Sequence, residues 1–173
     1  STQHGGIIVG LAGHGSHLFD GVKAPMYGPN GSTEWYRDVM AVTGACLALH
    51  KDLFAELGGF DAIYQVGYGD IDLCLSAVFD KKRVIYTPFA RLIHHEGSSR
   101  GLNLPPSDVL RASLKMFNLV KAGDPFFNPN LSVWNRVPTV VSTYETSREY
   151  FLLKVLQDFD VVSPASPTLL SLK

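Results

Sequence analysis

Residues 67–101, GYGDIDLCLSAVFDKKRVIYTPFARLIHHEGSSRG, join a segment of helical periodicity to a segment of strand character. Apolar residues recur at helical spacing through the first half, and Asp70 is the expected N-cap of that helix. The second half predicts an apolar strand, a turn at Pro88 and a second short strand that ends in His94 and His95. Helices alternating with strands predict an α/β fold, here a mixed sheet with flanking helices.

The other elements are each marked by a boundary signal. They are a short strand in the opening GGIIVG segment that runs into a loop rich in Gly and His, a strand near residues 39–49, a helix from residue 51 or 52 to the glycine pair at 58–59, a helix from an N-cap at Ser107 to Gly123, and a last helix near 147–159. A chain of 173 residues has the size of one domain. We expect that domain to span residues 1–160, followed by a tail at 161–173.

Charge and hydropathy exclude several classes of function. The chain has 15 Lys and Arg against 16 Asp and Glu, so no general attraction to nucleic acid or anionic lipid is expected. No apolar run approaches the roughly 20 residues of a membrane span, and the N-terminal residues lack the pattern of a signal peptide. We therefore expect a cytoplasmic protein. Association with a membrane through a short interfacial helix is an alternative that the sequence leaves open.

Asp70 and Asp72 have two alternative interpretations. Residues two positions apart on a helix point in directions that differ by about 200° around its axis. The two carboxylates are therefore not expected to act together on one atom. Asp70 either caps the helix by accepting backbone N–H groups, or it lies at the opening of a site and accepts a proton from a substrate hydroxyl. The residues alone favour the cap.

The histidines are weaker signals. His94 and His95 alternate along their expected strand, so only one is expected to face a given side. Next to Glu96 and the GSSRG loop, that histidine suits a divalent cation, and the loop suits a phosphate. Three further histidines are too loosely spaced to predict a metal site and are interpreted as incidental: His4, His14 and His17.

Four motifs resemble a known family. VTGACLALHKDLFAELGGFD, GYGDIDLCLSAV, VIYTPFARLIHHEGSSRG and GDPFFNPNLS cover most of residues 39–132, in the order and spacing of family 2 glycosyltransferases of the GT-A fold, especially bacterial rhamnosyltransferase-like members. The resemblance is to the second half of their catalytic domain. It implies the acceptor-side half of a GT-A fold, without the N-terminal nucleotide-binding half that carries the D-x-D motif.

The resemblance also implies roles for single residues. Asp70 corresponds to the general base that deprotonates the acceptor hydroxyl, and Asp72 to a supporting residue. Thr43 and Gly44 correspond to the turn beneath the donor sugar. Trp35 lies in an irregular loop suited to ligand contact, although packing is the alternative.

Two further roles concern the leaving diphosphate. By the resemblance, His94 is expected to be a ligand of Mn²⁺ or Mg²⁺, and Arg100 to contact the diphosphate. The implied reaction is an inverting, metal-assisted transfer of a sugar from a nucleotide-diphosphate donor to a glycan or lipid-linked acceptor. The interpretation that we favour is a piece of such an enzyme. The alternatives are a homo-oligomer or partner chain that supplies the nucleotide-binding half, and a non-catalytic binding or assembly module.

Overall fold

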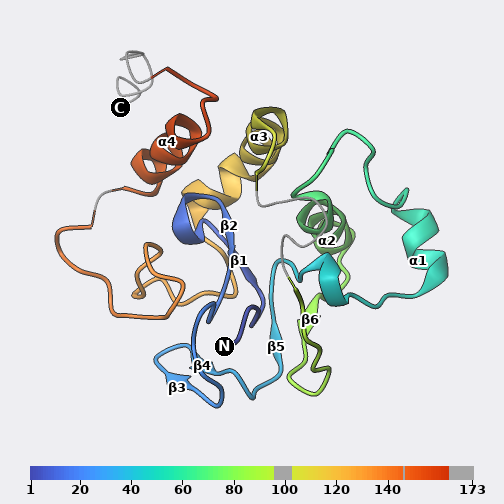
Figure 1. Cartoon of the computed structure of the whole chain (residues 1–173), viewed down its shortest axis with the longest axis horizontal. Helices are drawn as coiled ribbons and strands as arrows, with labels where there is room; N and C mark the ends of the chain where they lie inside the picture. The colour runs from blue at the N-terminus through green and yellow to red at the C-terminus, as the bar shows by residue number, and fades with distance from the viewer. Residues whose placement is uncertain (96–102, 146, 164–173) are drawn as a thin grey trace.

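The computed structural model describes residues 1–95, 103–145 and 147–163. A two-stranded antiparallel hairpin lies at its centre, formed by β1 (Ile7–Val9) and β2 (Gly15–His17). Ile7 pairs with His17, and Val9 pairs with Gly15. The chain turns between the two strands through a short 3₁₀ helix, η1 (Leu11–Gly13). This hairpin brings residues near the N-terminus to the middle of the molecule (Figure 1).

The described residues form four α-helices, all where the sequence predicts helices. They are α1 (Lys51–Glu56), α2 (Gly69–Phe79), α3 (Pro106–Ala122) and α4 (Arg148–Asp158). Helices α2, α3 and α4 pack on the core that includes β1, and α1 lies at the periphery (Figure 1). Ser147 caps α4 by accepting the N–H of Tyr150. Gly123 ends α3 with a φ of 94°, a conformation that favours glycine. The N-cap predicted at Ser107 lies two residues earlier, at Pro105, and α3 begins at Pro106.

The mixed sheet predicted from the sequence is not what the structure shows. Within the described residues the strands form three separate antiparallel pairs. Besides the central hairpin, these pairs are β3 (Tyr27–Gly28) with β4 (Gly31–Ser32), and β5 (Arg37–Asp38) with β6 (Ile85–Tyr86). The fold therefore belongs to a mixed α and β class with small antiparallel sheets.

One predicted strand is much shorter than expected, and another does not form. The strand expected at 39–49 is reduced to one bridge between Ala41 and Ile7, after which the chain enters a 3₁₀ helix, η2 (Gly44–Cys46). The second short strand expected before His94 is irregular chain. Its apolar residues Leu92 and Ile93 are exposed, so they have no buried face to fix a strand register.

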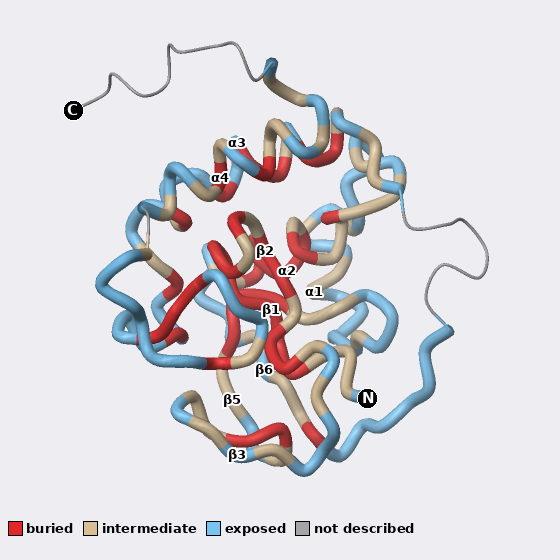
Figure 2. The backbone as a smooth tube through the Cα atoms, turned by 60° about the vertical axis from the view of Figure 1, so that its left-hand side comes forward, coloured by how far each residue is buried: buried red, intermediate tan, exposed pale blue. Residues whose placement is uncertain are grey.

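The apolar core consists of two clusters on opposite faces of the hairpin. Figure 2 shows that β1 and β2 lie among the buried parts of the chain. Successive residues of a strand point to opposite faces, and Ile7 and Val9 accordingly pack with α2, α3 and α4, whereas Ile8 packs with the second cluster. That second cluster includes Phe127 and Leu131 from the segment after α3. No helix among the described residues is long and apolar enough to cross a membrane.

Asp124, in the GDPFFNPNLS motif, links the end of α3 to the hairpin. Its carboxylate accepts the N–H of Val9 at 2.8 Å and the N–H of Phe126 at 2.8 Å. Burial raises the pKa of Asp124 to about 6, although both N–H donors act in the opposite direction. The motif therefore has a structural function in this chain, which is to hold strand β1 against the following turn.

The raised pKa of Asp124 predicts a pH dependence of stability. Between about pH 4 and pH 6 the folded state binds more protons at Asp124 than the unfolded state does. The contribution of this group to the free energy of unfolding is therefore complete below pH 4 and is lost as the pH rises through about 6. We expect the stability of the wild type relative to Asp124→Asn to fall by about 2–3 kcal/mol between pH 4 and pH 7. Urea unfolding of both proteins across this range measures the difference.

A matched control for that measurement is Asp158→Asn at the exposed end of α4. Its unfolding across the same range measures the general effect of removing one carboxylate at each pH. A difference between the wild type and Asp124→Asn that does not change with pH would contradict the assignment.

Candidate functional site

A cavity of about 870 Å³ opens between the β1–β2 hairpin, η2 and the N-terminal end of α2. Its wall also includes residues from the loop before α2 and from the segment after β6. The residues of chemical interest that line it are Asp20, Thr43, Gly44, Asp61, Asp70, His14, His17, His94, His95 and Arg136. The structure therefore gathers Asp70, Thr43, Gly44 and His94 around one space, as the family resemblance implies.

Asp70 lies in the first turn of α2 and is not its N-cap. The helix begins at Gly69, and the capping position is Tyr68, which has a left-handed φ of 68°. One oxygen of Asp70 accepts the N–H of Gly44 at 2.8 Å, and the other accepts the N–H of Ile71 at 2.9 Å. The carboxylate thus receives backbone N–H groups, as a cap would, but one of them comes from η2 across the cavity wall.

The Thr43-Gly44 turn is fitted closely to Asp70. Thr43 caps η2 by accepting the N–H of Ala45 at 3.3 Å. A methyl group added at Gly44 would lie 3.2 Å from the Cβ of Asp70. A larger residue at this position would therefore require Asp70 to shift by a few tenths of an ångström.

Both His94 and His95 line the cavity, which corrects the prediction that only one of them faces it. That prediction assumed a strand, and the chain here is irregular. The Nδ1 atom of His94 lies 2.9 Å from the side-chain oxygen of Gln3. This contact orients the ring from the N-terminal segment, a partner that no local sequence pattern indicates.

The N-terminal histidines lie in or near this region, a placement that the sequence did not indicate. The antiparallel register of β1 and β2 brings His4 and His17 together, with ring centroids 5.0 Å apart. His14 and His17 line the cavity, and the Nδ1 atom of His14 lies 3.4 Å from the hydroxyl of Tyr68. A strand-turn-strand pattern over residues 7–17 is the sequence signal that could have indicated that these histidines lie close together.

His4 and His14 are held in the neutral form. Burial, with a smaller effect of His17, lowers the pKa of His4 to about 3. Burial, and then the nearby charge of Arg136, lowers the pKa of His14 to about 4. Near neutral pH these rings therefore act as hydrogen-bond donors and acceptors, and the Nε2 atom of His4 accepts the N–H of Thr43 at 3.4 Å.

Three other residues predicted from the sequence lie elsewhere. Asp72 is absent from the cavity lining and bonds the hydroxyl of Tyr64 and the ammonium group of Lys115, so it ties α2 to α3. Trp35 is also absent from the lining and is exposed between β4 and β5. Arg100 lies outside the described residues.

Asp108 is a supporting residue that the sequence did not reveal. It is fully buried in the first turn of α3, and one of its oxygens accepts three successive N–H groups, from Gln65, Val66 and Gly67, at 2.9–3.2 Å. Burial raises the pKa of Asp108, but the three donors and the nearby Arg111 outweigh this effect, and the pKa lies below its usual value. This carboxylate fixes the loop that forms the cavity wall just before Asp70.

The described residues do not by themselves complete a site for a divalent cation. Among them there is no group of three or more His, Cys, Asp or Glu side chains arranged to hold a metal ion. His94 offers one imidazole, and its Nδ1 atom is already paired with Gln3. A cation at this position would need ligands beyond those described, so we derive no chemical step through it.

Comparison with known proteins gives two relatives of similar sequence. The chain is 38% identical over 136 residues to the O-antigen biosynthesis protein RfbC of Myxococcus xanthus. It is 33% identical over 141 residues to the uncharacterized protein y4gI of Sinorhizobium fredii (strain NBRC 101917 / NGR234). These alignments cover 77% and 76% of this chain, but only 11% and 15% of the relatives. The chain is thus similar to a small segment of much longer proteins.

Two other comparisons gave no match. No family model matches the chain, and no solved structure matches it. The evolutionary relationship therefore rests on the sequence similarity to RfbC and y4gI. Both alignments are long enough to include most of the cavity and its supporting elements.

Proposed function

We propose that this chain forms the acceptor side of a sugar-transfer site that acts in polysaccharide biosynthesis, in the manner of the family 2 glycosyltransferases. The observation that carries the proposal is the single cavity in which Asp70, the Thr43-Gly44 turn and His94 meet. The similarity to an O-antigen biosynthesis protein supports the same class of function. Residues 39–132, which carry the family motifs, supply most of the cavity wall.

The proposed chemistry is an inverting transfer. The acceptor oxygen attacks the anomeric carbon of the donor sugar, the bond from that carbon to the diphosphate breaks, and Asp70 takes the proton of the acceptor hydroxyl. Each Asp70 oxygen accepts one N–H group, which leaves further lone pairs for that proton. The contact with Gly44 also fixes the direction in which the carboxylate points.

The charges of the cavity suit an acceptor rich in hydroxyl groups. Three aspartates line it, Asp20, Asp61 and Asp70, whereas Arg136 is its one Lys or Arg side chain within the described residues. Arg136 also pairs with Asp20. A diphosphate would therefore need additional positive charge, for which Arg100 and a bound Mn²⁺ or Mg²⁺ remain proposals.

The nucleotide-binding half is proposed to come from elsewhere, either from another part of a longer polypeptide or from a partner chain. The segment around β6 and the irregular chain after it exposes large apolar side chains: Ile85, Phe89, Leu92 and Ile93. An apolar run of this kind beside a short strand pair is typical of a surface that another unit covers. The same surface would also serve association between copies of the chain.

One observation favours a second candidate, a non-catalytic binding or assembly module. Both oxygens of Asp70 are engaged by backbone N–H groups, which is also how a purely structural carboxylate behaves. Such a module would keep the cavity and bind a glycan without transferring a sugar.

A transfer assay separates the two candidates. The full-length protein is incubated with UDP-, dTDP- and GDP-sugars, Mn²⁺, and either lipid-linked or free oligosaccharide acceptors, and products are identified by mass spectrometry. A product extended by one sugar supports the enzyme. Glycan binding without any extended product supports the binding module instead.

A further inference from the structure

A second hollow shares Arg136 with the cavity and is lined in part by Ala12 of η1. It has a volume of about 540 Å³ and is lined by Ala12, Trp134, Asn135, Arg136, Val137 and Thr139. Arg136 lines both spaces, and its guanidinium group pairs with Asp20 in the wall of the first. The two spaces therefore meet at Arg136.

Trp134 forms a rigid aromatic wall of this hollow. Its ring stacks on Phe151 of α4, with ring centroids 4.9 Å apart and planes inclined by 26°. The backbone N–H of Trp134 donates to the hydroxyl of Ser132 at 3.1 Å. Yet the residue is 39% exposed, so packing on α4 fixes the indole while part of it faces solvent.

The polar groups around the indole are uncharged apart from Arg136. The amide of Asn135 donates to the hydroxyl of Thr139 at 3.2 Å, and both side chains line the hollow. A sugar ring has an apolar C–H face that stacks on an aromatic ring and a rim of hydroxyl groups that bond amides and hydroxyls. An indole beside an amide, a hydroxyl and a guanidinium group matches both features.

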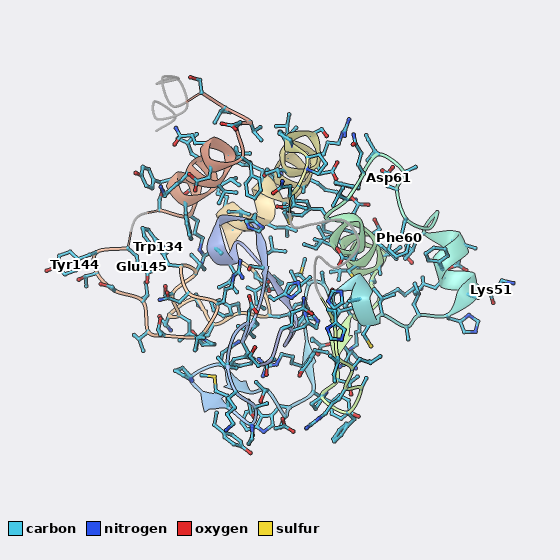
Figure 3. The ribbon with its side chains drawn as sticks, in the orientation of Figure 1. Lys51, Phe60, Asp61, Trp134, Tyr144 and Glu145 are labelled. Atoms are coloured by element: carbon cyan, nitrogen blue, oxygen red, sulfur yellow. The ribbon has the colours of Figure 1, made fainter. Side chains whose placement is uncertain are left out.

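We propose that this hollow, which we call the Trp134 subsite, binds a sugar unit of a growing acceptor glycan at a distance from the reacting hydroxyl. The proposal rests on the proposed function, because it extends the acceptor from Asp70 past Arg136 to Trp134. Figure 3 shows Trp134 at the opposite side of the molecule from Phe60 and Asp61, which line the first cavity. An acceptor that occupies both spaces is longer than one sugar unit.

The test uses an array of bacterial O-polysaccharides probed with the labelled full-length protein. We expect at least one polysaccharide to bind, and Trp134→Ala to weaken that binding about tenfold. Tyr27→Ala is the matched control, because Tyr27 is an exposed aromatic residue of β3 and lies outside both hollows. Its affinity should equal that of the wild type.

A second variant is needed because the ring of Trp134 packs on α4, so Trp134→Ala could misfold. Asn135→Ala removes an exposed amide and should weaken binding about threefold with an unchanged melting temperature. Binding of no polysaccharide, or equal affinity of both variants and the wild type, would overturn the proposal. Loss of UDP binding in Trp134→Ala would also overturn it, because the hollow would then hold a nucleobase.

Failure of this proposal can be told apart from failure of the proposed function. In an Asp70→Asn background, which stops transfer, Trp134→Ala should still weaken polysaccharide binding, because Asp70 does not line the Trp134 subsite. Trp134→Ala should still transfer a sugar to a monosaccharide acceptor, which is too short to reach the subsite. If transfer is absent in every protein while binding still depends on Trp134, only the catalytic proposal fails.

Discussion

Asp70→Asn is expected to lower the rate of sugar transfer by about a thousandfold, within the range that a general base contributes. Asparagine keeps the size of the side chain and one oxygen that can accept the N–H of Gly44, but it cannot take a proton from the acceptor. The affinity for the nucleotide should change little. Turnover is measured by release of the nucleoside diphosphate with saturating donor.

Asp61→Asn is the matched control for that substitution. Asp61 lines the same cavity and has the same charge, but its carboxylate accepts the N–H of Ile63 in its own loop. A change of cavity charge alone would slow both variants alike. Wild-type turnover in Asp70→Asn, or equal losses in the two variants, would remove Asp70 from the role of base.

Asp108→Ala is expected to destabilise the chain by about 3–5 kcal/mol. The substitution leaves three neighbouring, partly buried N–H groups, at Gln65, Val66 and Gly67, without their acceptor and opens a space at the buried position of Asp108. The loss should appear as a lower urea midpoint, together with faster hydrogen exchange at these three amides.

Asp108→Asn separates the acceptor from the charge. Its amide oxygen can still accept N–H groups, so we expect a loss of about 1–2 kcal/mol. If Asp108→Ala proves no less stable than Asp108→Asn, the three hydrogen bonds do not hold the loop before Asp70.

The helices were predictable from the sequence because their signals are local. The apolar spacing of α2, the glycine that ends α3 and the serine that caps α4 all lie within or beside their own helix. Strands depend on a partner that local sequence does not name. The predicted strand at 39–49 accordingly shrinks to a single bridge, and the chain before His94 is irregular.

The candidate site was partly predictable for the same reason. The family motifs place Asp70, Thr43, Gly44 and His94 in one region, and the structure brings them to one cavity. The contributions of His14, His17 and Arg136 depend on the register of the hairpin and on the segment after α3, which are long-range features. The three backbone hydrogen bonds to Asp108 join residues more than 40 positions apart and have no sequence signature.

The most direct test of the central claim is calorimetric titration of UDP, dTDP and GDP into the full-length protein, each with and without Mn²⁺. The account predicts that one nucleotide binds, more tightly with Mn²⁺, and that Asp70→Asn binds it with nearly the same affinity. Binding of none of the three nucleotides, with or without the metal, would contradict a sugar-transfer site and would favour the binding module.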